Sequence, residues 1–305
     1  MSTAPAELLP ESVPAAPPRG RRPGRRWGLY VSLAFVAFYV LVAVFGPLIV
    51  DYNPVTTHLT DRLLSPGSHT SDGGTAWLGT DNVGRDILGQ VIAGARTSLI
   101  VGLAAAVGAG LVGLAVGTVS GYLRGPVDAV VMRIIDIQLA FPAILLAIVI
   151  AGLFGHSLPN VVFALAVTRW IPFARVARAG TLSIRERDWV AAARVTGVAR
   201  RRIIGRHILP FVLAPAIAIS TIEFALIIVS EAGLSFLGVG LKSSTVSWGQ
   251  TIAAGQDYLN TAWWISTIPG LALMVLVVAI GIVGDQLTDP VTRSTARTAR
   301  TARSS

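Results

Sequence analysis

The sequence offers few residues whose type and spacing could carry out a reaction. Its four histidines are scattered and form no His-Glu-x-x-His pair of the kind that holds zinc on a helix. A nucleotide-binding loop needs Gly-Lys-Ser or Gly-Lys-Thr, but the only lysine, Lys242, follows Leu241. No Gly-x-Ser-x-Gly segment presents a nucleophilic serine, and the chain has no cysteine. We therefore predict that this chain has no catalytic residue, no metal site and no bound cofactor.

One acidic residue stands out because of its surroundings. Glu223 lies deep in an apolar segment, and a charge held against lipid there would cost about 2.5–3.5 kcal/mol. We therefore expect Glu223 to face protein or a water-filled path, with Ser220 on the same side of the helix. Two roles stay open for Glu223: a hydrogen bond to a neighbouring subunit, or a carboxylate that meets a cationic group in a translocation path. Ser220 and Glu223 are the candidates for such a path.

The composition sets the class of protein that must position these residues. Apolar residues make up 53% of the chain, charged residues only 13%, and the mean hydropathy is +0.66. These values are typical of an all-α integral membrane protein with several spans. The net charge of +9 does not indicate nucleic-acid binding, because the basic residues flank apolar segments and do not interleave with aromatic ones.

Six apolar segments have the length of membrane helices. They cover about residues 27–50, 98–122, 127–153, 161–179, 210–230 and 263–283. Residues 1–26 are predicted to be a disordered tail, since the apolar run that follows is longer than the roughly 7–15-residue core of a signal peptide. The prediction is a six-helix domain over residues 27–288, followed by a polar tail over residues 289–305.

Two local patterns bear on how these helices pack. Gly113, Gly117 and Gly121 are four residues apart in the second segment, and small residues at this spacing let helices approach backbone to backbone. Arg133 and Asp136, near the start of the third segment, are spaced to pair on one helical face. We favour this pairing over a proton relay.

Two long loops, residues 51–97 and 231–262, follow the first and fifth segments. In the first, Asp81 is predicted to cap a short amphipathic helix at the membrane surface. The second is too interrupted by glycine to span a membrane, and it ends at Trp263 and Trp264, which we expect at the membrane interface.

The distribution of basic residues predicts the topology. An even number of spans places both termini on one side of the membrane. Of the 25 lysines and arginines, only four fall in the two long loops or at their ends: Arg62, Arg85, Arg96 and Lys242. The side that carries the others is the cytoplasm by the positive-inside rule, so both termini are predicted to be cytoplasmic, and the two long loops extracytoplasmic.

Between the fourth and fifth segments lies a basic loop, residues 181–210, whose arginines must leave the hydrocarbon. Ala191, Ala192 and Ala193 favour a short helix with a face that lacks bulk, so another backbone can approach it. Gly197 is a natural end for this helix because it tolerates a left-handed turn. Pro210 fits the first turn of the next helix, where its missing N–H costs little.

The spacing of Ala192, Ala193, Gly197, Leu209 and Pro210 resembles the EAA loop of permease subunits in bacterial ABC importers. In that family the loop forms a coupling helix that docks into a groove on the ATP-hydrolysing subunit. The resemblance implies that the ATPase contacts come from Ala191, Ala192, Ala193, Gly197, Leu209 and Pro210. Ala191 stands where the family usually has glutamate, so the resemblance does not imply the contact of that glutamate for this chain.

Three further segments are similar to the C-type permease subunits of dipeptide and oligopeptide importers. They are the run LGTDNVGRDIL at 78–88 and the segments 132–142 and 231–241. The resemblance extends from Trp27 to Asp285. It implies a type I ABC importer permease fold with six transmembrane helices, in the bacterial plasma membrane.

By the same resemblance, the chain would form half of a translocation path for di- or oligopeptides. Its partners would be a second, B-type permease, one or two ATPase chains that bind ATP and Mg²⁺, an extracytoplasmic substrate-binding protein, and membrane lipid. Import of nickel or glutathione by the same architecture stays an alternative. A stand-alone secondary transporter is less favoured because no internal repeat is found, and a membrane enzyme because no catalytic motif is found.

Overall fold

The computed structural model describes residues 24–49, 53, 56–242 and 244–301, with side chains from 27 to 286 apart from residues 49–52, 54–55 and 243. Most of the predicted N-terminal tail and the last four residues lie outside this part. Five stretches of helix are long and apolar enough to cross a membrane: α1 (Gly24–Ile49), α2 (Ile87–Leu123), α5 (Leu158–Arg185), the stretch ending in α8 (Leu209–Phe236), and α10 (Trp264–Thr301). Together with the bent pair described next, the structure agrees with the predicted six spans.

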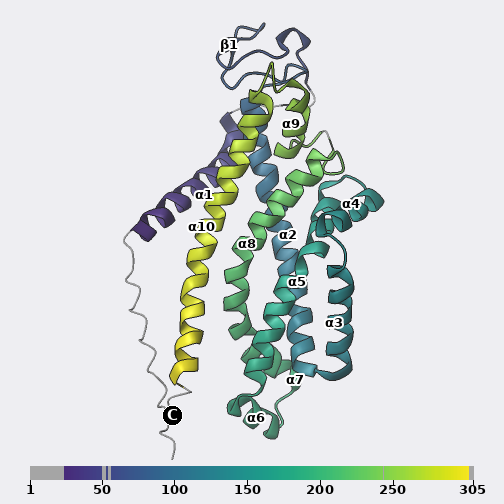
Figure 1. Ribbon diagram of the computed structural model, residues 1–305, viewed down its shortest axis with the longest axis vertical. Helices are drawn as coiled ribbons and strands as arrows, with labels where there is room; N and C mark the ends of the chain where they lie inside the picture. The colour runs from purple at the N-terminus through teal and green to yellow at the C-terminus, as the bar shows by residue number, and fades with distance from the viewer. Residues whose placement is uncertain (1–23, 50–52, 54–55, 243, 302–305) are drawn as a thin grey trace, which may run out of the picture.

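The third predicted span is not a straight helix. It consists of α3 (Gly125–Leu139) and α4 (Ala143–Phe154), which meet at an angle of 92°. The break falls at Pro142, which has no N–H to donate and disfavours a helical conformation at Phe141. Figure 1 shows α4 turned away from the axis of α3. The third span predicted over 127–153 is therefore a bent pair of helices, and the sequence analysis did not predict the bend.

The second membrane helix begins eleven residues earlier than predicted. Asp86, not Asp81, is the N-cap: its side chain accepts a hydrogen bond from the Gly89 N–H at 2.8 Å. Asp81 is fully buried and instead accepts bonds from the main-chain N–H groups of Val83 and Arg85, both at 2.9 Å. The predicted loop 51–97 therefore ends at Asp86.

The loop predicted over 231–262 also differs. Helix α8 continues to Phe236, and a short helix, α9 (Trp248–Gly255), follows, then a 3₁₀ turn, η3 (Gln256–Tyr258). Trp263 is half exposed, but Trp264 is buried and donates from its indole N–H to the Thr80 carbonyl at 3.1 Å. Trp264 therefore joins the start of α10 to the first loop, and its side chain is buried in the protein instead of facing the membrane interface as predicted.

The first loop is compact at the same end of the bundle. It contains the 3₁₀ turn η1 (Leu59–Asp61) and a two-stranded antiparallel sheet of β1 (Ser68–His69) and β2 (Thr75–Ala76). Figure 1 shows β1 and α9 at one end of the bundle and α6 and α7 at the other. We call the first of these the strand end and the second the loop end.

Helix α2 is central to the packing and contacts α5, α8 and α1. Its close contact with α5 depends on the predicted glycine stripe. A Cβ atom on Gly113 would overlap the Trp170 carbonyl oxygen, and one on Gly121 would lie 2.9 Å from the Arg178 carbonyl oxygen. The predicted backbone-to-backbone packing is thus confirmed.

Candidate functional site

The basic loop forms a compact layer at the loop end. It contains α6 (Asp188–Val195), α7 (Arg200–Arg202) and a π-helical turn, η2 (Ile203–Ile208), that leads directly into α8. Val190 anchors α6 because its side chain is fully buried in a cluster with Tyr122, Ile203 and Ile208. On the opposite side of α6, the small residues Ala191 and Ala192 are exposed, together with Val195.

The turn after α6 requires glycine. Gly197 has φ of +79°, and its N–H donates to the Arg194 carbonyl at 3.1 Å. The Val198 N–H donates to the Ala193 carbonyl at 3.0 Å, which completes the paired hydrogen bonds of a Schellman motif. The predicted left-handed end of the helix is confirmed, and a side chain at Gly197 would meet no atom within 4 Å but would be strained by this φ.

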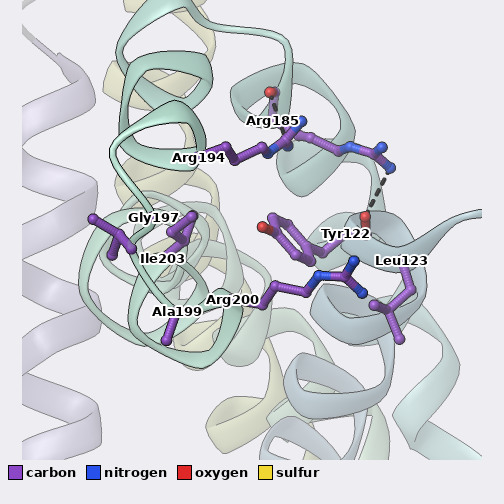
Figure 2. A pocket seen from close by; sticks show the side chains of 9 residues that line it. Tyr122, Leu123, Arg185, Arg194, Gly197, Ala199, Arg200 and Ile203 are labelled. Carbon is purple, nitrogen blue, oxygen red and sulfur yellow. Dashed lines mark hydrogen bonds between the residues drawn. The ribbon is translucent and has the colours of Figure 1, made fainter.

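Tyr122, at the end of α2, connects the basic loop to the membrane helices. The guanidinium carbons of Arg194 and Arg185 lie 5.3 and 5.9 Å from the centre of its ring. Arg185 also donates to the Tyr122 carbonyl at 2.7 Å, and Figure 2 shows this bond beside the ring. The loop is therefore held against the ends of both α2 and α5.

The remaining predicted residues of the loop lie at two places. Ala193 is half-buried on the inner side of α6. Leu209 is half-buried and Pro210 exposed in the first turn of α8, away from the outer face of α6. The structure thus brings Ala191 and Ala192 together on one exposed face, while Leu209 and Pro210 begin the next helix.

A second candidate site lies between α5 and α8, inside the apolar part of the bundle. Glu223 is 7% exposed, and its Oε2 atom lies 3.8 Å from Nη1 of Arg169. Arg169 also donates from Nη2 to the Ser230 hydroxyl at 2.8 Å. Glu223 is withdrawn from lipid as expected, and its partner is an arginine of a neighbouring helix.

Ser220 does not take part in this arrangement. It is half-buried, and its hydroxyl donates to the Ile217 carbonyl of its own helix at 2.7 Å. The residue that sequence reasoning missed is Arg169. Its position in an apolar segment was a usable signal, since a basic residue there needs a carboxylate or a water-filled path.

Glu231 is a further residue whose position the sequence did not indicate. It was expected in a loop, but it lies in α8 with its side chain fully buried. Its Oε1 atom accepts bonds from the hydroxyls of Ser235 at 2.8 Å and Ser247 at 2.7 Å. Glu231 therefore connects α8 to the segment before α9 at the strand end.

No cluster of three or more histidine, cysteine or acidic side chains that could hold a metal ion occurs in the described part of the chain.

Comparison with known proteins shows the family to which the chain belongs. Residues 113–297 match the family model described as binding-protein-dependent transport system inner membrane component, and residues 25–66 match the N-terminal TM domain of oligopeptide transport permease C. The chain belongs to the binding-protein-dependent transport system inner membrane component family.

Individual relatives narrow this assignment. A putative peptide transport system permease protein of Brucella suis is 42% identical over 88% of both chains. The di/tripeptide transport system permease protein DppC of Pseudomonas aeruginosa is 36% identical over 86% of both. The nickel transport system permease protein NikC of Escherichia coli is 33% identical over 87% of this chain and 93% of its own length.

The fold agrees with this family. An inward-facing structure of the MetNI methionine ABC transporter matches 67% of this chain and 97% of its own chain, with a TM-score of 0.55 and 20% identity. The resemblance drawn from the sequence is confirmed: the protein is a multi-pass permease subunit of the ABC importer class, in the dipeptide, oligopeptide and nickel group.

Proposed function

We propose that this permease imports di- or oligopeptides across the bacterial plasma membrane, with both termini and the basic loop in the cytoplasm. The proposal rests on the two relatives named for peptide transport, which are 42% and 36% identical to this chain over 88% and 86% of its length. It pairs with a second permease, receives substrate from an extracytoplasmic binding protein, and is driven by ATP and Mg²⁺ on separate ATPase chains.

The contact with the ATPase is assigned to the basic loop. Its support is the exposed face of α6, where Ala191 and Ala192 allow close approach of another backbone. Since Ala191 carries no charge, the ionic contact that glutamate makes in the wider family is absent, and the docking depends on shape and on the surrounding arginines. Movement of α6 would reach α2 and α5 through Arg194, whose guanidinium lies 5.3 Å from the centre of the Tyr122 ring and donates to the Arg185 carbonyl at 3.3 Å.

Co-purification and transport test this proposal. The tagged chain, purified from the cells that encode it, should retain an ATPase, and proteoliposomes should take up a labelled peptide only with ATP and binding protein present. Uptake of ⁶³Ni²⁺ without peptide uptake would favour the nickel alternative, which the relative named for nickel keeps open. Purification without any ATPase would contradict the proposal.

A further inference from the structure

A hollow of about 470 Å³ lies between the basic loop and the ends of α2 and α5. Figure 2 shows the side chains that line it, including three arginines: Arg185, Arg194 and Arg200. The ring of Tyr122 forms part of the wall, and Leu123 and Ile203 add apolar surface. Its volume lies in the range of small-molecule sites, about 300–1,000 Å³.

The charges of these arginines are not neutralised by the side chains of the hollow. Arg185 and Arg194 donate to main-chain carbonyl groups, of Tyr122 and Arg185 respectively, and none of the three arginines forms an ion pair within the described residues. Glu186, next to Arg185 in sequence, pairs with Arg124 at 2.7 Å and does not line the hollow. The hollow is therefore a concentrated positive site.

We infer that this hollow binds a phosphate group, carried by an anionic lipid headgroup or by a free phosphate. The planar forks of arginine match the oxygens of phosphate and form short, charge-assisted hydrogen bonds with them. The site lies where two membrane helices end, and basic pockets at that level bind lipid headgroups. Leu123 is partly exposed beside it and provides a surface for the apolar part of a lipid.

The position of the hollow distinguishes this ligand from an acidic side chain of the ATPase. Of the residues assigned to the ATPase contact, only Gly197 lines the hollow, whereas Ala191 and Ala192 lie on the exposed face of α6 outside it. Arg194 projects from the inner side of α6, toward Tyr122 and the ends of the membrane helices. The inference goes beyond the transport proposal and does not depend on which substrate is carried.

Two neighbouring arginines provide a matched test. Both side chains are exposed, but only Arg200 lines the hollow, so Arg200→Gln and Arg201→Gln remove the same charge from adjacent positions. The full chain, purified with its co-purifying subunits and delipidated, is titrated with phosphatidylglycerol and with phosphatidylcholine in native mass spectrometry. Binding of ³³P-orthophosphate is measured by equilibrium dialysis.

We expect phosphatidylglycerol to bind more tightly than phosphatidylcholine, and Arg200→Gln to weaken that binding about tenfold, as loss of one hydrogen bond between charged groups does. Arg201→Gln should bind like the parent. Orthophosphate binding that shows the same dependence on Arg200, without lipid selectivity, assigns the site to free phosphate. If the Arg200→Gln variant unfolds, Arg200→Lys is used instead. It keeps the positive charge but lacks the planar guanidinium group, so it should bind phosphatidylglycerol with an affinity between those expected for the parent and for Arg200→Gln.

Three results would overturn the inference. The first is equal weakening of binding by Arg200→Gln and Arg201→Gln, which would show a general charge effect. The second is that neither phosphatidylglycerol nor orthophosphate binds measurably to the parent protein. The third is that Arg200→Gln releases the ATPase while lipid and phosphate binding stay unchanged, which would assign the hollow to the partner protein.

Discussion

Gly117 of α2 lies against the main chain of Ala174 in α5, so closely that a Cβ atom on Gly117 would overlap the Ala174 carbonyl oxygen. Gly113 has the same relationship to Trp170 one turn away. Contacts of this kind resist sliding and separation, because neither backbone has a side chain that can adjust. We expect α2 and α5 to move as one body when the basic loop, which is bonded to the ends of both, is displaced.

Gly117→Ala should therefore destabilise the protein by about 1–3 kcal/mol, the usual cost of overpacking. The measurement is the thermal unfolding midpoint of the purified protein in detergent. Gly108→Ala in the same helix is the control, because its added Cβ would lie 3.4 Å from the Cβ of Ala166, a contact that a small shift can accommodate. Equal midpoints for the two variants would contradict the packing argument.

A second prediction concerns the link between α3 and α5. Asp128 accepts two hydrogen bonds of 2.6 Å from Nε and Nη2 of Arg178. Asp128→Asn should lower stability by about 1–3 kcal/mol, because it removes the charge from a bidentate pair. Asp136→Asn is the control. Asp136 is exposed, and the pair predicted with Arg133 is absent from the ion pairs of the described residues. A similar loss in both variants would show that the bidentate pair adds nothing.

The spans and the glycine stripe could be predicted because each depends on a single local property of the sequence: apolar length for the spans, and small residues at regular spacing for the stripe. The bend at Pro142 was missed because hydropathy does not report backbone direction. Glu231 was assigned to a loop because its charge and the nearby glycines are loop signals, whereas Ser235 and Ser247 satisfy it inside the protein. Arg169 and Glu223 lie on different helices, and sequence spacing within one helix could not bring them together.

The third prediction concerns coupling. Gly197→Arg should abolish transport at unchanged abundance. A residue other than glycine costs about 1–2 kcal/mol at this left-handed φ, and the strain is relieved only if the turn after α6 changes its conformation. Gly205→Arg is the matched control, because Gly205 is exposed in the same loop with open space around it and without positive φ. Uptake is measured in vesicles. Normal uptake by Gly197→Arg, or equal loss in both variants, would refute the role of this turn.

Topology can be tested with single cysteines because the parent has none. Ser157 precedes the first turn of α5, and Ser183 is exposed near its end, about 39 Å away at 1.5 Å per residue. Ser157→Cys should react with an impermeant maleimide from outside the cell, and Ser183→Cys only from inside. Labelling of both cysteines from one side would be incompatible with a membrane-crossing α5.

The last prediction separates two roles for Glu223. Glu223→Gln leaves Arg169 without its carboxylate, so we expect the free energy of unfolding to fall by about 1–3 kcal/mol. This is less than the cost of breaking a fully buried ion pair, because 22% of the Arg169 side chain is exposed. Arg169→Gln should cost a similar amount. The double variant removes both charges and should recover most of the stability, since the two effects are coupled.

Transport decides what the pair does beyond stability. If the carboxylate meets a cationic group of the substrate, as a peptide amino terminus would provide, peptide uptake should stay low in the double variant even though its unfolding midpoint is restored. Glu223→Leu should also fail to transport, because it places an apolar side chain beside Arg169. If uptake returns together with stability when both charges are removed, the pair only holds α5 against α8. The absence of any effect in all these variants, with normal assembly, would leave Glu223 with neither role.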